Sequence, residues 1–200
     1  MLPVPPLPRR KPVRPTALGL SIVGAIIVVL TALPIYLHAT RKRADQLVVV
    51  KQTTEVFFNP GDQTTTAVVG ELKAAKQNVH VQAYSFTSAP IAKALVEATK
   101  RGVAVIAVLD KSNKTAQYSS ADFLAHEGVP TFIDSKHAIA HNKIMIIDGG
   151  IVITGSFNFT KAAQESNAEN LLVLRDEKLA QKYEANWQKH FAHSEPYAGR

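Results

Sequence analysis

The sequence predicts an α/β protein with a mixed central β-sheet, helices on both faces of that sheet, and one transmembrane helix before it. Three observations lead to this fold class. Apolar runs of strand length alternate with segments of helical periodicity. One run, residues 103–109, is apolar almost throughout, as expected for a strand buried on both faces. Residues 16–40 are uncharged and long enough to cross a bilayer as a helix.

The individual elements follow from local patterns. Runs rich in β-branched and aromatic residues that end at turn residues indicate strands, and apolar positions three or four residues apart indicate helices. Gly102 and Gly128 stand where helices would end, and Asp148-Gly149-Gly150 is a hairpin turn signal. The expected strands are residues 55–58, 78–86, 103–109, 130–133, 144–147, 151–154 and 171–174. The expected helices are residues 64–76, 89–101, 121–127 and 177–191.

Composition and charge exclude several classes of protein. The chain has no cysteine, which excludes a disulfide framework, a zinc ribbon and a thiol nucleophile. Seven of its 23 basic residues lie in residues 1–43, which hold no acidic residue. The remaining 16 basic residues are balanced by all 16 acidic ones, so the body of the protein is formally neutral. The net charge of +7 is therefore no sign of a general nucleic-acid-binding surface.

The N-terminal segment divides the chain into an anchor and a body. Six prolines before Thr16 predict an extended, basic tail over residues 1–15, and residues 16–40 predict a transmembrane signal anchor or a cleaved signal peptide. Basic residues flank both sides and slightly favour a cytoplasmic N-terminus. The domain would then lie on the periplasmic side of a single-pass plasma (inner) membrane protein, or be secreted to the periplasm after cleavage. The other expected segments are a linker at 41–53, the enzymatic domain at 54–194 and a C-terminal tail at 195–200.

One segment carries a chemical signature. The sequence HNKIMIIDGGIVITGSFN matches the pattern HxK(x)4D(x)6GSxN, and its fixed positions are His141, Lys143, Asp148, Gly155, Ser156 and Asn158. His141 and Lys143 are two apart on an expected strand, so their side chains share a face. An imidazole, an ammonium and a carboxamide without paired carboxylates suit a phosphodiester better than a divalent metal. Lysine and asparagine would hold the non-bridging oxygens while histidine attacks phosphorus.

These residues resemble the motif of the phospholipase D superfamily. Within it, the chain looks like the small single-motif bacterial endonucleases over about residues 56–187. The resemblance includes the segments AYSFT (83–87), KALVEATKRGV (93–103), GSFNFTKAA (155–163) and SNAEN (166–170). It implies a metal-independent hydrolase without cofactors. A phospholipid-hydrolysing phospholipase D, held at a membrane through residues 16–40, is the alternative.

The resemblance also implies a role for each site residue. Because the family mechanism needs two such motifs and this chain has one, it implies a homodimer with one shared site. One His141 would form a phosphohistidine, and the other would protonate the leaving alcohol and then activate water. Lys143 and Asn158 would clamp the phosphate, Ser156 would bind it or support the pocket, and Glu169 would orient the histidine ring. Asp148 belongs to the catalytic motif, although its place in a hairpin turn favours a structural role.

Other residues admit simpler interpretations. Lys111, Lys114, Lys136 and His137 lie in expected loops and either line a substrate groove or are solvated loop charges. Ser85, Thr87 and Ser88 follow a strand end and are candidates for substrate contact. His80, His126, His190 and His193 show no spacing typical of a metal site, and no metal is predicted. A tethered binding module without activity is a third class, disfavoured by the intact motif.

Overall fold

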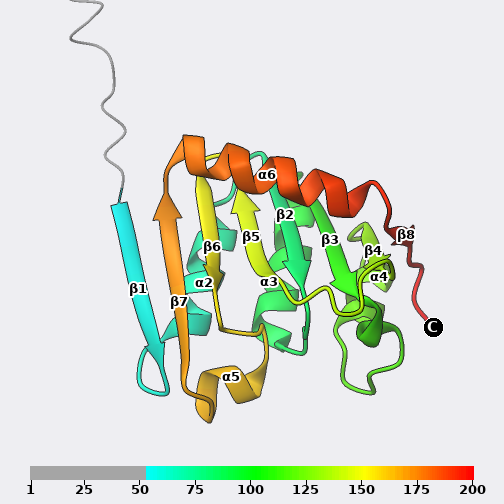
Figure 1. Cartoon of the computed structure of the whole chain (residues 1–200), viewed down its shortest axis with the longest axis horizontal. Helices are drawn as coiled ribbons and strands as arrows, with labels where there is room; N and C mark the ends of the chain where they lie inside the picture. Colours follow the sequence, from blue (N-terminus) through cyan, green and yellow to red (C-terminus); the bar gives the residue numbers. More distant parts are fainter. Residues whose placement is uncertain (1–52) are drawn as a thin grey trace, which may run out of the picture. The chain divides into compact units, whose positions relative to one another are not determined.

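Eight strands form one mixed β-sheet in the computed structural model, which describes residues 53–200 (Figure 1). The sheet order is β1-β7-β6-β5-β2-β3-β4-β8. The strands are β1 (Thr53–Asn59), β2 (Asn78–Ala83), β3 (Ala104–Asp110), β4 (Thr131–Asp134), β5 (Lys143–Ile147), β6 (Ile151–Gly155), β7 (Glu169–Arg175) and β8 (Glu195–Pro196). The predicted tail, the predicted transmembrane segment and most of the predicted linker lie outside the described residues.

The sheet is parallel only where helices connect its strands. β2 is parallel to β3 and β3 to β4, because α3 (Ala89–Lys100) and α4 (Ala121–His126) cross from one strand to the next. The other neighbours pair antiparallel, including the β5–β6 hairpin at Asp148-Gly149. Asp148 and Gly149 both have positive φ, 52° and 63°, as the two central residues of a type I′ turn require. The predicted mixed sheet is thus confirmed.

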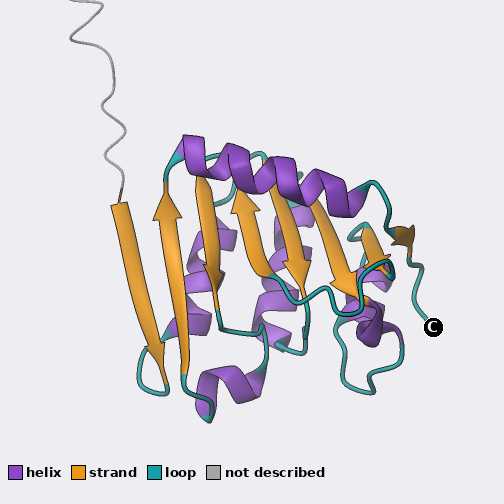
Figure 2. Cartoon of the chain, in the orientation of Figure 1, coloured by secondary structure: helices purple, strands orange, loops and turns teal. Residues whose placement is uncertain are grey.

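Helices cover both faces of the sheet, as predicted (Figure 2). α2 (Thr64–Ala74) and α3 pack on one face, and α6 (Glu177–Phe191) crosses the other. β5 shows the consequence, because Met145 and Ile147 belong to the core beneath α2 and α3. Ile144 and Ile146 belong to the core beneath α6. A strand buried on both faces reads as a continuous apolar run, and KIMII does so.

Two contacts fix α6 across the sheet. The Asp176 side chain caps the N-terminus by accepting hydrogen bonds from the backbone N–H groups of Lys178 and Leu179. Trp187, 1% exposed, donates its indole N–H to the carbonyl oxygen of Val81 on β2 at 2.9 Å. Its ring also stacks on that of His80, with centroids 4.2 Å apart. α6 is therefore held over β2, beside the strands that carry the motif.

Three elements were not expected from the sequence. They are the 3₁₀ turn η1 (Lys111–Lys114), the short helix α5 (Lys161–Glu165) and the strand β8. Each is five residues or shorter, too short for a periodic pattern to indicate it.

The C-terminal residues pack against the domain. Residues 195–200 were expected to be a tail, yet Glu195 pairs with Ile133 of β4. Tyr197 and Arg200 donate hydrogen bonds to Asp122 and lower the pKa of that carboxyl to about 2. Within residues 53–200, no helix combines the length and apolar character needed to span a bilayer.

Candidate active site

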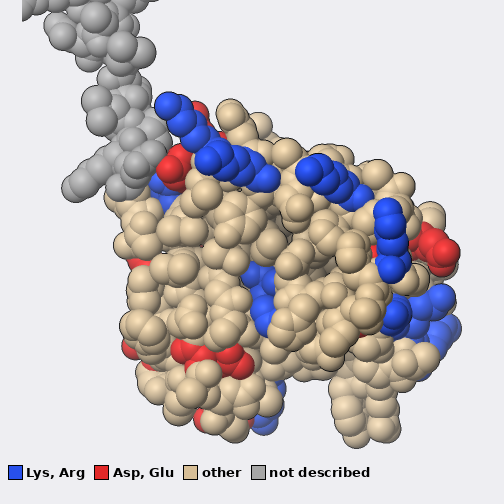
Figure 3. All heavy atoms as spheres, viewed as in Figure 1, with Lys and Arg blue, Asp and Glu red and all other residues tan. Residues whose placement is uncertain are grey.

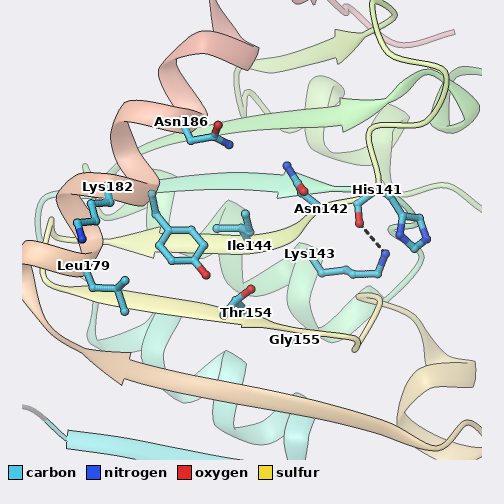
Figure 4. Close-up of a pocket in the computed structure, with 10 residues that line it drawn as sticks. His141, Asn142, Lys143, Ile144, Thr154, Gly155, Leu179, Lys182 and Asn186 are labelled. Carbon is cyan, nitrogen blue, oxygen red and sulfur yellow. Dashed lines mark hydrogen bonds between the residues drawn. The ribbon is translucent and has the colours of Figure 1, made fainter.

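Neighbouring strands bring the candidate catalytic residues other than Asp148 to one end of the sheet. His141 and Asn142 directly precede β5, whose first residue is Lys143. Ser156 and Asn158 directly follow β6, and Glu169 opens β7. Because β5, β6 and β7 are adjacent in the sheet, the end of β6 lies between the start of β5 and the start of β7. Figure 4 shows the His141 ring and the Lys143 side chain close together at this end of the sheet.

Lys143 is held beneath the exposed His141. Its Nζ donates a hydrogen bond of 2.8 Å to the backbone oxygen of His141 (Figure 4). Nζ also lies 5.1 Å from the centre of the Tyr84 ring, whose centroid is 4.6 Å from that of His141. Lys143 is only 6% exposed, and burial lowers its pKa, although the negative charge of Glu169 partly opposes this shift. A buried cation with spare donors and an exposed imidazole thus lie side by side.

Asn158 presents an unpaired oxygen. The flanking Phe157 and Phe159 are completely buried and anchor this segment in the core. Ser88 and Thr87 donate their backbone N–H groups to the carbonyl oxygen of Phe159, which fixes it further. The Oδ1 atom of Asn158 is buried and has no hydrogen-bond partner among residues 53–200. A buried polar atom without a partner is costly, and because Oδ1 is an acceptor, only a hydrogen-bond donor would relieve that cost.

Ser156 and Glu169 form a second pair. The Ser156 hydroxyl donates to Glu169 Oε2 at 2.5 Å and accepts from the backbone N–H of Asn170 at 3.0 Å. Asn167 donates its amide to the other carboxylate oxygen of Glu169 at 3.1 Å. The glutamate expected to orient the histidine ring is therefore bonded to Ser156 and Asn167 in the described chain. Its role toward His141 stays a prediction.

Gly155 explains the glycine of the motif. A Cβ atom on this residue would lie 2.2 Å from the carbonyl oxygen of Asn170 on β7. That same oxygen accepts the backbone N–H groups of Ser156 and Phe157. Only a residue without a side chain lets the two strands approach this closely. This close approach lies at the end of β6, beside the start of β5, and it precedes Ser156 and Asn158.

The chain resembles known proteins over most of this domain. A family model described as "Cardiolipin synthase, PLD-like domain" matches residues 68–191. A protein named phospholipase D from Rickettsia typhi is 39% identical over 137 residues, which is 68% of this chain and 67% of that protein. Nuc from Salmonella typhimurium, described as a phospholipase D family member, has a solved structure with 37% identity and a TM-score of 0.71, covering 74% of this chain and 99% of Nuc. The chain belongs to the phospholipase D superfamily.

More distant relatives agree with this assignment. NucT from Helicobacter pylori has a TM-score of 0.68 at 26% identity, covering 74% of this chain and 100% of NucT. The mitochondrial cardiolipin hydrolase of Xenopus laevis is 27% identical over 135 residues, which is 68% of this chain and 64% of that protein. The protein is thus a hydrolase, a phosphodiesterase of the phospholipase D superfamily.

Asp148, although part of the superfamily motif, is bonded to the backbone of another loop. Its carboxylate accepts the backbone N–H groups of Lys76, Gln77 and Asn78 at 2.9, 2.7 and 3.1 Å. Burial would raise its pKa, but these three donors outweigh burial and keep the pKa below its usual range. The structural role that its hairpin position favoured agrees with these contacts. Asp148 ties the hairpin turn to the loop between α2 and β2.

A pocket of about 490 Å³ opens beside the superfamily motif. His141, Lys143 and Gly155 line it from the sheet, and Lys182, Tyr183 and Asn186 line it from α6. Sequence patterns did not single out these α6 residues as functional, because a turn of an amphipathic helix carries no chemical signature. Tyr84 was also missed as an individual residue, although its segment AYSFT was noted. Tyr84 directly follows β2, which pairs with β5, and this position is the signal that could have identified it.

The remaining candidates lie away from this pocket. Thr87 and Ser88 line a separate pocket of about 330 Å³ together with residues of α5. Lys111 donates its ammonium to the carbonyl oxygen of His137 at 3.0 Å, and so joins two loops. His137 contacts Asp134. None of these residues is among those that line the pocket at His141.

Proposed function

We propose that this phosphodiesterase is an endonuclease that cleaves DNA or RNA at a site shared by two copies of the chain. One observation carries the shared site. His141 is exposed, and no second histidine of residues 53–200 has a hydrogen bond or ring contact with it. Double displacement at phosphorus needs both a nucleophile and an acid for the leaving group. A second copy supplies the missing histidine.

The chemistry follows from these groups. An imidazole nitrogen of one His141 forms a bond to phosphorus as the bond to the leaving oxygen breaks, and the partner's His141 gives its proton to that oxygen. The same histidine of the partner subunit then takes a proton from water, which attacks phosphorus and releases the first His141. Lys143 and Asn158 bind the non-bridging oxygens throughout and offset their charge. No metal ion or cofactor takes part in either step.

Glu169 has a place in this dimer. Its carboxylate is bonded to Ser156 and Asn167 within the chain, but each oxygen can accept a further hydrogen bond. We infer that it accepts the ring N–H of the partner's His141, which would fix the orientation of that ring. This assignment accounts for the lack of a bond between Glu169 and His141 within residues 53–200.

A polyanionic substrate fits the face on which the pocket opens. The body of the chain is formally neutral, yet α6 carries the exposed lysines Lys178, Lys182 and Lys189. Figure 3 shows Lys and Arg side chains along the edge of the molecule where α6 runs. Lys182 also lines the pocket beside His141. A row of cations next to a phosphodiester site attracts a nucleic-acid backbone more than a single lipid head group.

Phospholipid hydrolysis is the second candidate, and two observations favour it. The Rickettsia relatives are named phospholipase D, and residues 16–40 have the composition of a membrane anchor. We infer that such an anchor would place the domain on the periplasmic side, or that its cleavage would release the domain there. Protease treatment of intact and lysed cells, followed by detection of the domain, would test this placement.

The deciding experiment compares substrates on the full chain purified in detergent. Plasmid DNA, single-stranded RNA and vesicles of phosphatidylcholine or cardiolipin are each incubated in EDTA, with circular dichroism recorded to show that the chain is folded. His141→Ala is tested beside His126→Ala, which removes an exposed histidine of α4. We expect nucleic-acid cleavage in EDTA, unchanged in His126→Ala and reduced at least about 10³-fold in His141→Ala.

Each other outcome has a definite meaning. Hydrolysis of lipid alone would replace the nuclease with a phospholipase D. Loss of cleavage in EDTA by the folded chain that added Mg²⁺, but not Zn²⁺, restores would overturn the phosphohistidine mechanism. No turnover on any substrate, with phosphodiester binding retained, would leave a binding module.

A further inference from the structure

A second cluster of chemically active side chains lies outside the active site. Asp134 ends β4, His137 follows in the next loop, His190 is in the last turn of α6, and His193 lies just beyond it. We call these four residues the Asp134 cluster. One potential ligand atom from each residue lies within 4.8 Å of all the others. Both pairs have the spacing i, i+3, but 56 residues separate Asp134 from His190.

The three imidazoles converge on one carboxylate. The distances from the carboxylate oxygens to His190 Nδ1, His137 Nδ1 and His193 Nε2 are 2.8, 3.1 and 3.1 Å. In a tetrahedral zinc site with bonds of about 2.0–2.1 Å, neighbouring ligand atoms are about 3.3 Å apart. The nitrogen–oxygen distances are thus close to those of a zinc site. The rings are also near one another, with centroid distances of 4.8, 5.3 and 5.5 Å.

The buried carboxylate of the Asp134 cluster favours the binding of a cation. The Asp134 side chain is fully buried, and its carboxylate oxygens face the rings of His137, His190 and His193. Neutral imidazoles can donate hydrogen bonds to the carboxylate, but they leave a buried negative charge without a full countercharge. A divalent ion bound by the imidazole nitrogens and the carboxylate would supply that countercharge.

We propose that the Asp134 cluster binds one Zn²⁺ ion with tetrahedral geometry. Imidazole nitrogen and carboxylate oxygen are both ordinary zinc ligands, and four protein ligands fill the coordination sphere. A filled sphere leaves no position for water or substrate, so the ion has a structural role. The absence of cysteine from the chain does not prevent such a site.

The position of the cluster defines what the ion would stabilise. His190 and His193 belong to the C-terminal end of α6, whereas His137 lies in the loop that leads to His141. That loop is also held by Lys111 Nζ, bonded to the His137 carbonyl oxygen at 3.0 Å, and by Asp110, which accepts the Ala140 N–H at 2.7 Å. Zinc would therefore fasten the loop before the catalytic histidine to the helix that forms the other wall of the pocket.

The test measures zinc directly, without an activity assay. The full chain in detergent is freed of metal with a chelator, dialysed, and titrated with Zn²⁺ by calorimetry, and the bound metal is counted by elemental analysis. Co²⁺ serves as a spectroscopic probe of tetrahedral geometry. We expect one Zn²⁺ per chain. With free Zn²⁺ at about 100 times Kd, we expect Tm to rise by roughly 5–10 °C.

Three variants separate the Asp134 cluster from other histidines. His190→Ala/His193→Ala should lose zinc binding and the rise in Tm. His126→Ala and His141→Ala should keep both, which also makes the result independent of the proposed endonuclease mechanism. Should the double variant fail to fold, His137→Ala removes a side chain that is 43% exposed and should weaken zinc binding at least about tenfold.

Two results would overturn the proposal. One is a metal-free wild-type chain that takes up no Zn²⁺ and shows no change in Tm. The other is equal zinc binding by His137→Ala or the double variant and by wild type, which would place any bound zinc elsewhere. In either case the Asp134 cluster would be a hydrogen-bonded anchor without a metal.

Discussion

At the residue scale, a single backbone contact explains why position 155 of the motif is a glycine. We expect Gly155→Ala to lower Tm by roughly 5 °C or more, because its Cβ would lie 2.2 Å from the Asn170 carbonyl oxygen and β6 and β7 would have to separate. Activity should fall as well, since Ser156 and Asn158 follow this point. Thermal unfolding measures the first effect and phosphodiester turnover the second.

A matched glycine on α2 serves as the control. A Cβ at Gly70 would meet no atom within 4 Å, so Gly70→Ala should leave activity unchanged and raise Tm slightly through higher helix propensity. Equal losses of stability in the two variants would contradict the argument from close approach.

Substitutions of Tyr84 test how its ring packs against His141 and Lys143. Its ring lies 4.6 Å from that of His141 and 5.1 Å from Lys143 Nζ. We expect Tyr84→Phe to keep most of the activity, because the ring is retained and the hydroxyl makes no hydrogen bond within the described part of the chain. Tyr84→Ala should lower kcat by about tenfold or more, because the side chains of His141 and Lys143 would lose the ring that packs against them. Steady-state kinetics of the two variants compare these effects, and equal losses would point to the hydroxyl instead.

At the element scale, Asp148 joins the β5–β6 hairpin to the loop after α2. Asp148→Asn keeps the turn conformation but weakens the three hydrogen bonds from backbone N–H groups, so we expect a loss of about 2 kcal/mol in the free energy of unfolding. Activity well below Tm should change less than tenfold. Denaturant unfolding and turnover at 25 °C check the two expectations, and a much larger loss of activity in the folded variant would give Asp148 a chemical role.

The same carboxylate gives a defined pH dependence. Its pKa in the folded state lies below the unfolded value of about 3.9. Its contribution to stability is therefore complete above about pH 4 and is lost as the pH falls through the folded pKa. We expect the difference in unfolding free energy between wild type and Asp148→Asn to shrink below pH 4. A difference that grows on acidification would contradict the assignment.

Substitutions of the α6 lysines would distinguish a nucleic-acid substrate from a lipid substrate. Lys182 lines the pocket, whereas Lys178, one turn earlier, is exposed but does not line it. We expect Lys182→Ala to raise KM for an oligonucleotide and to reduce the salt dependence of binding by about one phosphate contact. Lys178→Ala should change both much less. Identical effects of the two variants would indicate attraction by overall charge without a contact in the pocket.

Element recognition from sequence succeeded where patterns were long. The strand at β3 and the helix at α6 were indicated by seven and fifteen residues of consistent pattern. By contrast, β8 has two residues and is a strand only because Phe132 and Ile133 of β4 lie beside it. A local pattern cannot indicate an element whose hydrogen bonds are all supplied by a distant segment.

At the scale of the whole molecule, the proposed shared site predicts how mixed dimers behave. When equal amounts of wild-type and His141→Ala chains are unfolded and refolded together, about half of the dimers should be mixed. If each dimer needs both histidines, only the dimers of two wild-type chains are active. Total activity should then be about one quarter of that of wild-type protein alone at the same total chain concentration. Two independent sites would retain about half. Turnover of the mixture measures this, and size-exclusion chromatography with light scattering verifies that dimers are present.

The sequence alone determined the superfamily, the mixed sheet and the central motif residues, for a physical reason. His141 to Asn158 span one hairpin, so local chain geometry brings most of the site together. The tertiary structure decided what lies around that hairpin. Only the packing of β2 and α6 against β5 places Tyr84 and Lys182 near His141. The Asp134 cluster likewise forms because α6 ends over β4, which brings together residues 56 and 59 positions apart. Contacts between distant segments depend on the whole fold and leave no local pattern in the sequence.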